Sequence, residues 1–332
     1  MRAPRRHPAR RRVRAVHSLA LAGLLLASLA VASMTRSADS AAPIAPPGRP
    51  PDGARQPIVG PLRVATLNVA HGRRDAFNQL LLGRATFERN LDAIARLLRE
   101  TKADVVALQE ADGPSRWSGG FDHVARLAEE AGYPWHARAS HATSWWFDYG
   151  TALLARAPLL GTRSHAFRPT PPSLTKGFLL AQVAWQPVSA DPAVRLVDLL
   201  SVHLDFSRRG VRSRQVAEIA EVLAGRANPA IVLGDFNSDA TGADSAVGQL
   251  ATRCGLRTHR PEAVDLGTFR SSGRRLDWVL LSDELEFTTY RVVRRLVSDH
   301  DAVVAEIGLR GSGNDVATHP SAGAPRSPRP SP

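Results

Sequence analysis

Six short polar clusters in this chain each adjoin an apolar run that is typical of a β-strand. They are Asn68, Gln109-Glu110, Asp148-Tyr149-Gly150, His203-Leu204-Asp205, Gly234-Asp235-Phe236-Asn237 and Ser298-Asp299-His300. A strand end on a rigid scaffold holds a side chain still, so polar residues that converge there are candidates for a functional site. Together the clusters offer carboxylates, carboxamides and imidazoles, which are groups that bind cations and transfer protons.

The donor types predict which cation such a site would take. Carboxylate and amide oxygens suit hard cations, so Mg²⁺, Mn²⁺ or Ca²⁺ fits this set better than zinc. Cys254 is the only cysteine, which excludes an internal disulfide framework and any multi-cysteine zinc or iron–sulfur site. Each cluster alone has a structural explanation, since Gly-Asp-Phe-Asn often forms a plain turn and a lone histidine is often a core residue. Their joint occurrence at strand ends is what indicates a site.

The elements that would position these clusters alternate along the central 250 or so residues. Strand-like runs are expected at Leu62–Leu67, Asp104–Leu108, Thr151–Leu154, Arg195–Leu204, Ala230–Leu233, Leu276–Leu281 and Ala302–Ile307. Helix-like patterns lie between them; Phe87, Leu91, Ile94 and Leu98, for example, share one helix face. This alternation predicts one large α/β domain, residues 58–309, with helices covering sheet faces.

The two ends of the chain differ from this domain in composition. Residues 1–32 pair an arginine-rich start with an apolar run of about 14 residues and small residues after it, which predicts a signal peptide and export to the periplasm or the medium. An uncleaved membrane anchor is the alternative. Residues 33–57 have the composition of an Ala/Pro-rich linker and residues 310–332 that of a disordered tail. Most of the formal charge of +12 lies in these ends, which leaves +2 for residues 58–309 and no bulk-charge signal of DNA binding.

Over residues 60–309 the chain resembles the endonuclease/exonuclease/phosphatase, or DNase I-like, superfamily. The motifs that carry the resemblance are Arg63-Val64-Ala65-Thr66-Leu67-Asn68-Val69, Gln109-Glu110, Gly234-Asp235-Phe236-Asn237, Leu276-Asp277-Trp278-Val279 and Ser298-Asp299-His300. Two positions depart from the pattern of many bacterial relatives, Thr151 in place of Asn and Trp278 in place of His or Tyr. The resemblance implies a four-layer α/β sandwich of two packed β-sheets flanked by helices, with the site at one end.

The resemblance also implies roles for individual residues. Glu110 is the expected principal metal ligand, with Asn68 close by and Asp299 as a further ligand. Asp277 and His300 resemble the family's carboxylate–imidazole pair, which would activate water or hold the scissile phosphate. Asp235 and Asn237 would orient the attacking water and a phosphoryl oxygen, and His203 would donate a hydrogen bond or a proton.

Asp148 occupies the position where relatives carry an acid that reaches the histidine of the Ser201-Val202-His203 strand. We therefore expect Asp148 to contact His203 and to keep its imidazole protonated. The alternative is that Asp148 only caps its strand and that His203 meets the substrate unaided.

The sequence leaves the substrate open between nucleic acid, phospholipid or sphingolipid, and inositol phosphate, because this scaffold serves all of them. Arg208 and Arg212, in a run with Arg209 and Arg214, could meet a polyanion or simply be solvated. Trp145 and Trp146 could stack on a base, enter a lipid surface or form a core edge. The leading expectation is an exported metal-dependent phosphoesterase. A secreted binding module without catalysis is the second, and no feature indicates an oligomer.

Overall fold

The computed structural model describes residues 56–187, 193–242 and 245–311. The expected signal peptide, nearly all of the expected linker and most of the expected tail lie outside these ranges. In the part of the chain that is described, no helix is long and apolar enough to cross a membrane. Within these ranges, the strands and helices fall between Ile58 and Leu309.

Two β-sheets form the centre of the molecule. The first has six strands in the order β12-β13-β2-β3-β5-β4. Their bounds are β2 Leu62–Asn68, β3 Val105–Asp112, β4 Trp135–Thr143, β5 Asp148–Ala155, β12 Leu285–Val293 and β13 Ala302–Leu309. The β2–β3 pair is parallel and the others are antiparallel, so the sheet is mixed.

The second sheet has seven strands in the order β1-β7-β8-β9-β11-β10, with β6 paired to β7 off this path. Their bounds are β1 Ile58–Val59, β6 Leu160–Ala166, β7 Gly177–Gln186, β8 Arg195–His203, β9 Ala230–Asp235, β10 Arg257–Thr258 and β11 Asp277–Leu281. The pairs β8–β9 and β1–β7 are parallel and the remaining pairs antiparallel, so this sheet is also mixed.

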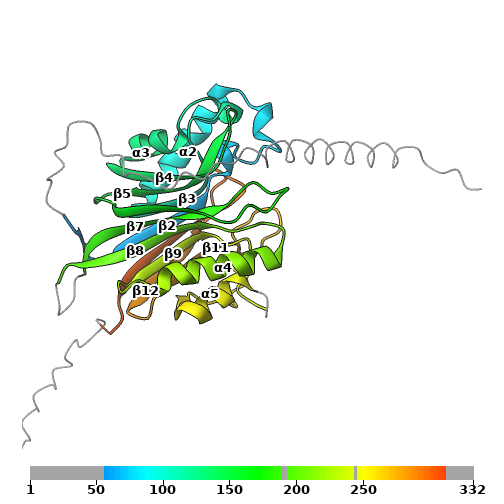
Figure 1. Ribbon diagram of the computed structural model, residues 1–332. Coiled ribbons are helices and arrows are strands. Elements are labelled where there is room, and N and C mark those ends of the chain that lie inside the picture. The colour runs from blue at the N-terminus through cyan, green and yellow to red at the C-terminus, as the bar shows by residue number, and fades with distance from the viewer. Residues whose placement is uncertain (1–55, 188–192, 243–244, 312–332) are drawn as a thin grey trace, which may run out of the picture.

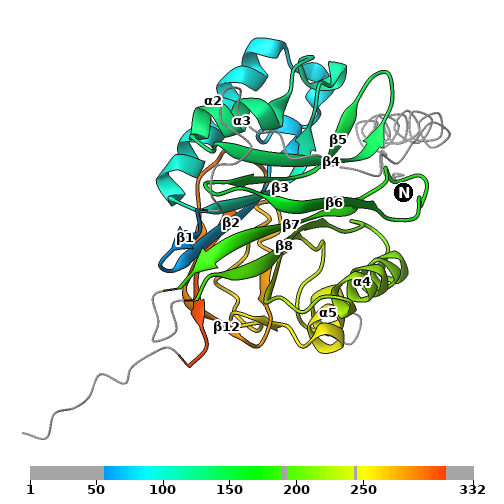
Figure 2. The ribbon, with the colours of Figure 1, turned by 60° about the vertical axis from the view of Figure 1, so that its left-hand side comes forward.

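The four α-helices of the described residues cover the two outer sheet faces. Their bounds are α2 Arg84–Thr101, α3 His123–Ala131, α4 Arg209–Ala224 and α5 Ala246–Cys254. Figures 1 and 2 show α2 and α3 on one side of the stacked sheets and α4 and α5 on the other. The predicted four-layer sandwich is therefore confirmed.

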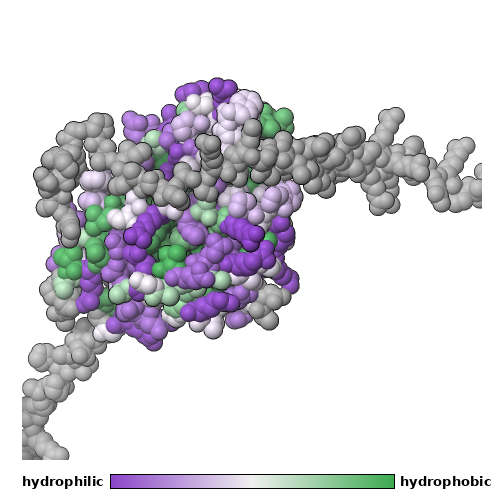
Figure 3. All heavy atoms as spheres, viewed as in Figure 1, coloured by the Kyte–Doolittle hydropathy of each residue, from purple (hydrophilic) through white to green (hydrophobic). Residues whose placement is uncertain are grey.

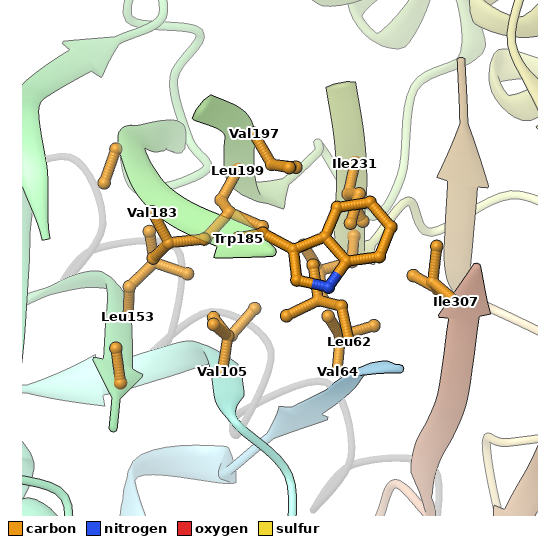
Figure 4. Packing of buried hydrophobic residues seen from close by; sticks show 14 of the residues in the cluster. Leu62, Val64, Val105, Leu153, Val183, Trp185, Val197, Leu199, Ile231 and Ile307 are labelled. Atoms are coloured by element: carbon orange, nitrogen blue, oxygen red, sulfur yellow. The ribbon is translucent and has the colours of Figure 1, made fainter. Parts of the chain in front are cut away.

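Three hydrophobic clusters fill the spaces between these layers. One lies between the sheets, and Figure 4 shows Trp185 of β7 at its centre with Leu62, Val105 and Ile231 around it. The indole N–H of Trp185 donates to the carbonyl of Gly60 at 2.7 Å, so burial leaves no unpaired donor on this ring. The other two clusters lie under the α2–α3 pair and the α4–α5 pair.

Strand β8 illustrates why the strand segments of this sequence are continuous runs of apolar residues. Val197 and Leu199 face the core between the sheets, whereas Leu200 and Val202 face the helices. Side chains alternate between the two faces of a strand, and both faces are buried here, so both sets of positions must be apolar.

Candidate active site

Strand register brings the predicted site residues to one end of the sandwich. His203, at the end of β8, lies opposite Asp235, at the end of β9, and Asp235 lies opposite Asp277, at the start of β11. In the other sheet, Asn68 ends β2 opposite Gln109 of β3, directly before Glu110. Residues that are far apart in sequence therefore meet where these strands terminate.

Asp235 is the buried centre of this arrangement. Its Oδ2 atom accepts a hydrogen bond from the Asn68 amide at 3.0 Å, and its Oδ1 atom accepts one from the backbone N–H of Asn237 at 2.9 Å. The same Oδ2 lies 3.6 Å from Nε2 of His203 and 4.0 Å from Nε2 of His300. Asp235 thus links both sheets and both histidines.

Glu110 reaches the site through a distortion of β3. Its backbone has a φ of 49°, and the β3–β5 register shifts between Gln109 and Ala111, as in a β-bulge. The carboxylate lies 3.3 Å from Nε2 of His71 and 3.9 Å from Nε2 of His203. Burial opposes its ionisation, but the charges of His71 and Lys176 outweigh that effect and hold the pKa of Glu110 well below its usual range.

Asp277 and His300 lie in contact as the carboxylate–imidazole pair that the sequence predicts. The Nδ1–H of His300 donates to Oδ2 of Asp277 at 2.7 Å, and both residues are buried. Burial alone would lower the pKa of His300, but the attraction of Asp277 raises it to about 10. Burial, with the neighbouring negative charge of Asp277, also raises the pKa of Asp235 to about 6 despite the opposing effect of His300. His300 is therefore a cation at neutral pH.

The predicted contact between Asp148 and His203 is wrong. Asp148 instead accepts a hydrogen bond from Arg138 at 2.8 Å, across the β4–β5 pair. The Nε2 atom of His203 lies 3.0 Å from the ammonium of Lys176. Burial and the charge of Lys176 lower the pKa of His203 well below its ordinary value, so its ring is neutral rather than the imidazolium expected from the sequence.

Asp299 and Asn237 lie at the same end but have partners of their own. Asp299 forms an ion pair with Arg73 at 2.5 Å. The side-chain amide of Asn237 donates to the Leu204 carbonyl at 3.0 Å, which ties the Gly-Asp-Phe-Asn turn to the end of β8. Trp278, which replaces the His or Tyr of many bacterial relatives, donates from its indole N–H to the Ser238 carbonyl at 2.9 Å. It therefore supports the same turn.

The four expected substrate contacts divide into two kinds. Arg208 pairs with Asp205 at 3.0 Å and donates to the Pro171 carbonyl, and the largely buried Arg212 donates to the backbone carbonyl of Asp205. Both arginines thus make contacts that stabilise the loop after β8. Trp145 and Trp146, by contrast, are exposed at the tip of the β4–β5 hairpin.

Sequence reasoning missed two residues of this site, His71 and Lys176. His71 bridges two acids, because its Nδ1–H donates to Asp112 at 2.8 Å while its Nε2 faces Glu110. Lys176 reaches the centre from the loop immediately before β7, a strand that was not expected either. The rarity of lysine could have drawn attention to Lys176, because Lys102 is the only other lysine in this arginine-rich chain.

The donor set suits a hard cation. One ligand atom each from Asp235, Asp277 and His300 lies within 4.8 Å of the others, and these residues are buried. Oδ1 of Asp277 is buried and has no hydrogen-bond partner among the residues that the structure describes, and Glu110 adds a partly exposed carboxylate nearby. Oxygen-rich groups of this kind are compatible with a divalent cation.

Comparison with known proteins agrees with this geometry. The model of the Endonuclease/Exonuclease/phosphatase family matches residues 65–300, whereas a sequence comparison with curated proteins gives no match. An endonuclease/exonuclease/phosphatase structure from Beutenbergia cavernae is 21% identical with a TM-score of 0.59, and the alignment covers 76% of this chain and 72% of that one.

Two further solved structures each align over 74% of this chain and 99% of their own. They are a mannosyl-6-phosphatase from Bacteroides thetaiotaomicron, 18% identical with a TM-score of 0.52, and sphingomyelinase C from Streptomyces griseocarneus, 18% identical with a TM-score of 0.51. At such identities the structural likeness establishes a common fold. The family model covers every polar cluster described above and most strands of both sheets, and the chain belongs to the endonuclease/exonuclease/phosphatase family, whose members hydrolyse phosphate esters.

Proposed function

We propose that this protein is an exported, divalent-metal-dependent phosphoesterase that cleaves its substrate by the attack of a water molecule. The observation that carries the proposal is the convergence of Asn68, Glu110, Asp235, Asp277 and His300 at one end of the sandwich. A phosphate ester repels nucleophiles because it is anionic, so its hydrolysis needs both positive charge and a positioned water.

Glu110 is the residue that we expect to hold the cation, with the Asn68 amide beside it. Its carboxylate is partly exposed, whereas the trio of Asp235, Asp277 and His300 is buried and partnered internally. Asp299 can contribute only if its ion pair with Arg73 opens. When bound, the cation would neutralise phosphate charge and favour ionisation of water. Mg²⁺, Mn²⁺ and Ca²⁺ all suit this oxygen-rich set.

Asp235 is the group best suited to orient and deprotonate the water. Burial raises its pKa to about 6, which brings the carboxylate close to the range in which a general base works best near neutral pH. Asn237 fixes one of its oxygens through the backbone N–H. His300, whose pKa is raised to about 10 by Asp277, would hold a phosphoryl oxygen as a cation rather than accept a proton.

Lys176 would supply positive charge on the side of His203. Neutral His203 faces the ammonium at 3.0 Å and so positions it. Burial lowers the pKa of Lys176, while Glu110 and Asp235 favour its charged form. A fixed cation in a buried site stabilises the charge that develops on an oxygen in the transition state.

Export rests on the composition of residues 1–32. We expect the mature protein to begin near Ser33 and to be recovered outside the cytoplasm. Mass spectrometry of the protein from its native host tests this. A cytoplasmic form that retains Met1 would contradict export, and a membrane-bound form that retains residues 1–32 would indicate an uncleaved anchor.

A substrate panel tests the catalytic proposal. Protein comprising residues 33–332 contains every described strand and helix. It should be offered bis-nitrophenyl phosphate, plasmid DNA, RNA, sphingomyelin and inositol phosphates, each with Mg²⁺ and with EDTA. We expect hydrolysis of at least one ester that EDTA abolishes. Undiminished hydrolysis in EDTA would refute metal dependence, and tight ligand binding without any hydrolysis would favour a binding module.

Glu110→Gln is the matching variant. Loss of this carboxylate should lower kcat/KM by about 10²-fold or more, because a well-placed electrostatic group has an effect of that size. Calorimetric Mg²⁺ titration should show weakened binding as well. Glu129→Gln, on the exposed face of α3, is the control and should retain both properties.

A further inference from the structure

Most of the large apolar side chains that the structure exposes lie at the active-site end. Phe77, Leu80, Leu81, Trp145 and Trp146 come from two segments there, and we call these five residues the apolar rim. Phe77 is 84% exposed, Leu81 78% and Trp145 71%. Figure 3 shows hydrophobic side chains at the upper right edge of the molecule, where the cyan segment lies in Figure 1.

Both segments of the rim contact one short 3-10 helix, η3, Arg116–Ser118. Leu80 and Leu81 belong to the 3-10 helix η2, Gln79–Leu81, which packs against η3. The backbone N–H of Trp117 in η3 donates to the Trp146 carbonyl, and its ring stacks on Phe147 at 4.5 Å between centroids. The rim is thus a continuous part of the folded domain.

The same helix connects the rim to the catalytic groups. The Trp117 ring lies 5.0 Å from the His71 ring, and its indole N–H donates to Asp112 at 2.7 Å. His71 in turn faces Glu110. A surface that met the rim would therefore lie against the mouth of the site.

The charges around the rim are mostly positive. The exposed arginines in or near these segments are Arg74, Arg84, Arg89 and Arg116, and Asp75 is the exposed acid among them. Arg74 lies 3.7 Å from Asp75 and Arg84 2.9 Å from Glu88, whereas no acid is paired with Arg89 or Arg116 among the ion pairs of the described residues. The guanidinium of Arg116 lies 5.8 Å from the Trp145 ring. Aromatic and aliphatic side chains ringed by cations match the chemistry of an anionic membrane surface, where apolar groups enter the acyl boundary and arginines meet headgroups.

We propose that the apolar rim docks on an anionic lipid bilayer, so that the active site meets the phosphoester headgroup of a membrane lipid. The proposal rests on the phosphoesterase function proposed above. Single-stranded nucleic acid is less suited to this surface, because bases stack on aromatic rings whereas Leu80 and Leu81 offer none. Several large apolar side chains exposed together beside a site favour an interaction surface over ordinary surface variation.

Vesicle flotation with the chain from Ser33 onward tests the docking. Vesicles of phosphatidylcholine alone and vesicles that also contain phosphatidylglycerol are the two probes. We expect binding to the anionic vesicles, reduced by added salt because the arginine contribution is screened. Leu80→Ser/Leu81→Ser should weaken that binding by about tenfold or more, and Trp145→Ala/Trp146→Ala should do the same.

The control is Val194→Ser. Val194 is 55% exposed, but it precedes β8 at the opposite end of that strand from His203, so it should not alter vesicle binding. Hydrolysis of soluble bis-nitrophenyl phosphate by Leu80→Ser/Leu81→Ser should match that of the parent chain. Its hydrolysis of a lipid in vesicles should fall with the binding.

The outcomes separate this inference from the function on which it rests. Metal-dependent hydrolysis of soluble esters without vesicle binding would overturn docking and leave the phosphoesterase function standing. Vesicle binding without hydrolysis of any ester would refute that function instead. Binding unaffected by both rim variants, binding of single-stranded DNA in place of vesicles, or self-association lost with the rim would each show that the surface serves another partner.

Discussion

At the scale of single residues, Asp148 shows that an acid can stand at the position expected from a motif and still contact a different partner. Its carboxylate meets Arg138, which also donates to the hydroxyl of Ser140 at 2.7 Å. Asp148→Asn should therefore cost about 1 kcal/mol of stability or less, the usual range for a part-exposed ion pair. The alkaline limb of the pH–rate profile should stay where it is in this variant. A shift of that limb would indicate that Asp148 does influence the protonation of His203.

Lys176 is the opposite case, because no sequence motif predicted that it belongs to the site. Lys176→Met should lower kcat by about 10²–10³-fold through the loss of positive charge at the reacting phosphate. The variant should also raise the pKa of His203, since the neighbouring ammonium is one cause of its depression after burial. An NMR titration of the His203 ring measures this second effect. Unchanged kcat together with an unchanged ring titration would exclude Lys176 from the site.

At the scale of elements, the Gly-Asp-Phe-Asn turn depends on its glycine. Gly234 has a φ of +149°, and a Cβ atom there would lie 2.0 Å from the carbonyl oxygen of Val202. Gly234→Ala should therefore separate β8 from β9, lower stability by about 1–3 kcal/mol or more, and displace Asp235.

Thermal unfolding and kcat/KM of the same preparation measure both effects. Gly225→Ala is the control, because Gly225 has an ordinary negative φ and no atom within 4 Å of an added Cβ. Equal stability of the two variants would show that the close approach of β8 to β9 is not essential.

Apart from β7, the strands whose two faces are buried were predictable, whereas the partly exposed strands were not. The expected run Ala230–Leu233 forms β9 and the expected run Leu62–Leu67 forms β2, because continuous apolar sequence is what a doubly covered strand requires. Strands β4 and β12 escaped prediction. Polar residues alternate with small alanines in β4, and much of β12 is solvent-exposed, so neither has a continuous apolar run.

At the scale of the whole molecule, two buried histidines should make stability depend on pH in opposite directions. Burial lowers the pKa of His141 to about 3, against about 6.5 in an unfolded chain. The unfolded state then binds more protons between these values, so stability is full above pH 6.5 and falls as pH drops towards 3. The loss should be on the order of 3–5 kcal/mol.

His300 acts on the alkaline side of the metal-free protein. Its pKa is raised to about 10, so its contribution is full below about pH 6.5 and is lost as pH rises towards 10. Denaturant unfolding in EDTA across this range should give a maximum near neutrality. His141→Gln should reduce the acid-side loss and leave the alkaline side unchanged, because glutamine can still meet Thr151 but does not titrate. Part of the acid-side loss should remain, because burial also lowers the pKa of His203. An acid side unchanged in this variant would assign the proton uptake to other groups.

The sequence by itself determined the fold class and the polar clusters that line the site. Apolar runs of strand length and acids, amides and imidazoles at their ends are local patterns, and Asn68, Glu110, Asp235, Asp277 and His300 are visible in them. Tertiary structure alone decided which partner each of these residues meets. The pairing of β4 with β5 lets the long side chain of Arg138 reach Asp148, and the loop before β7 brings Lys176 to His203. These pairings depend on strand order and burial, because a charge's pKa and role follow from neighbours that are distant in sequence.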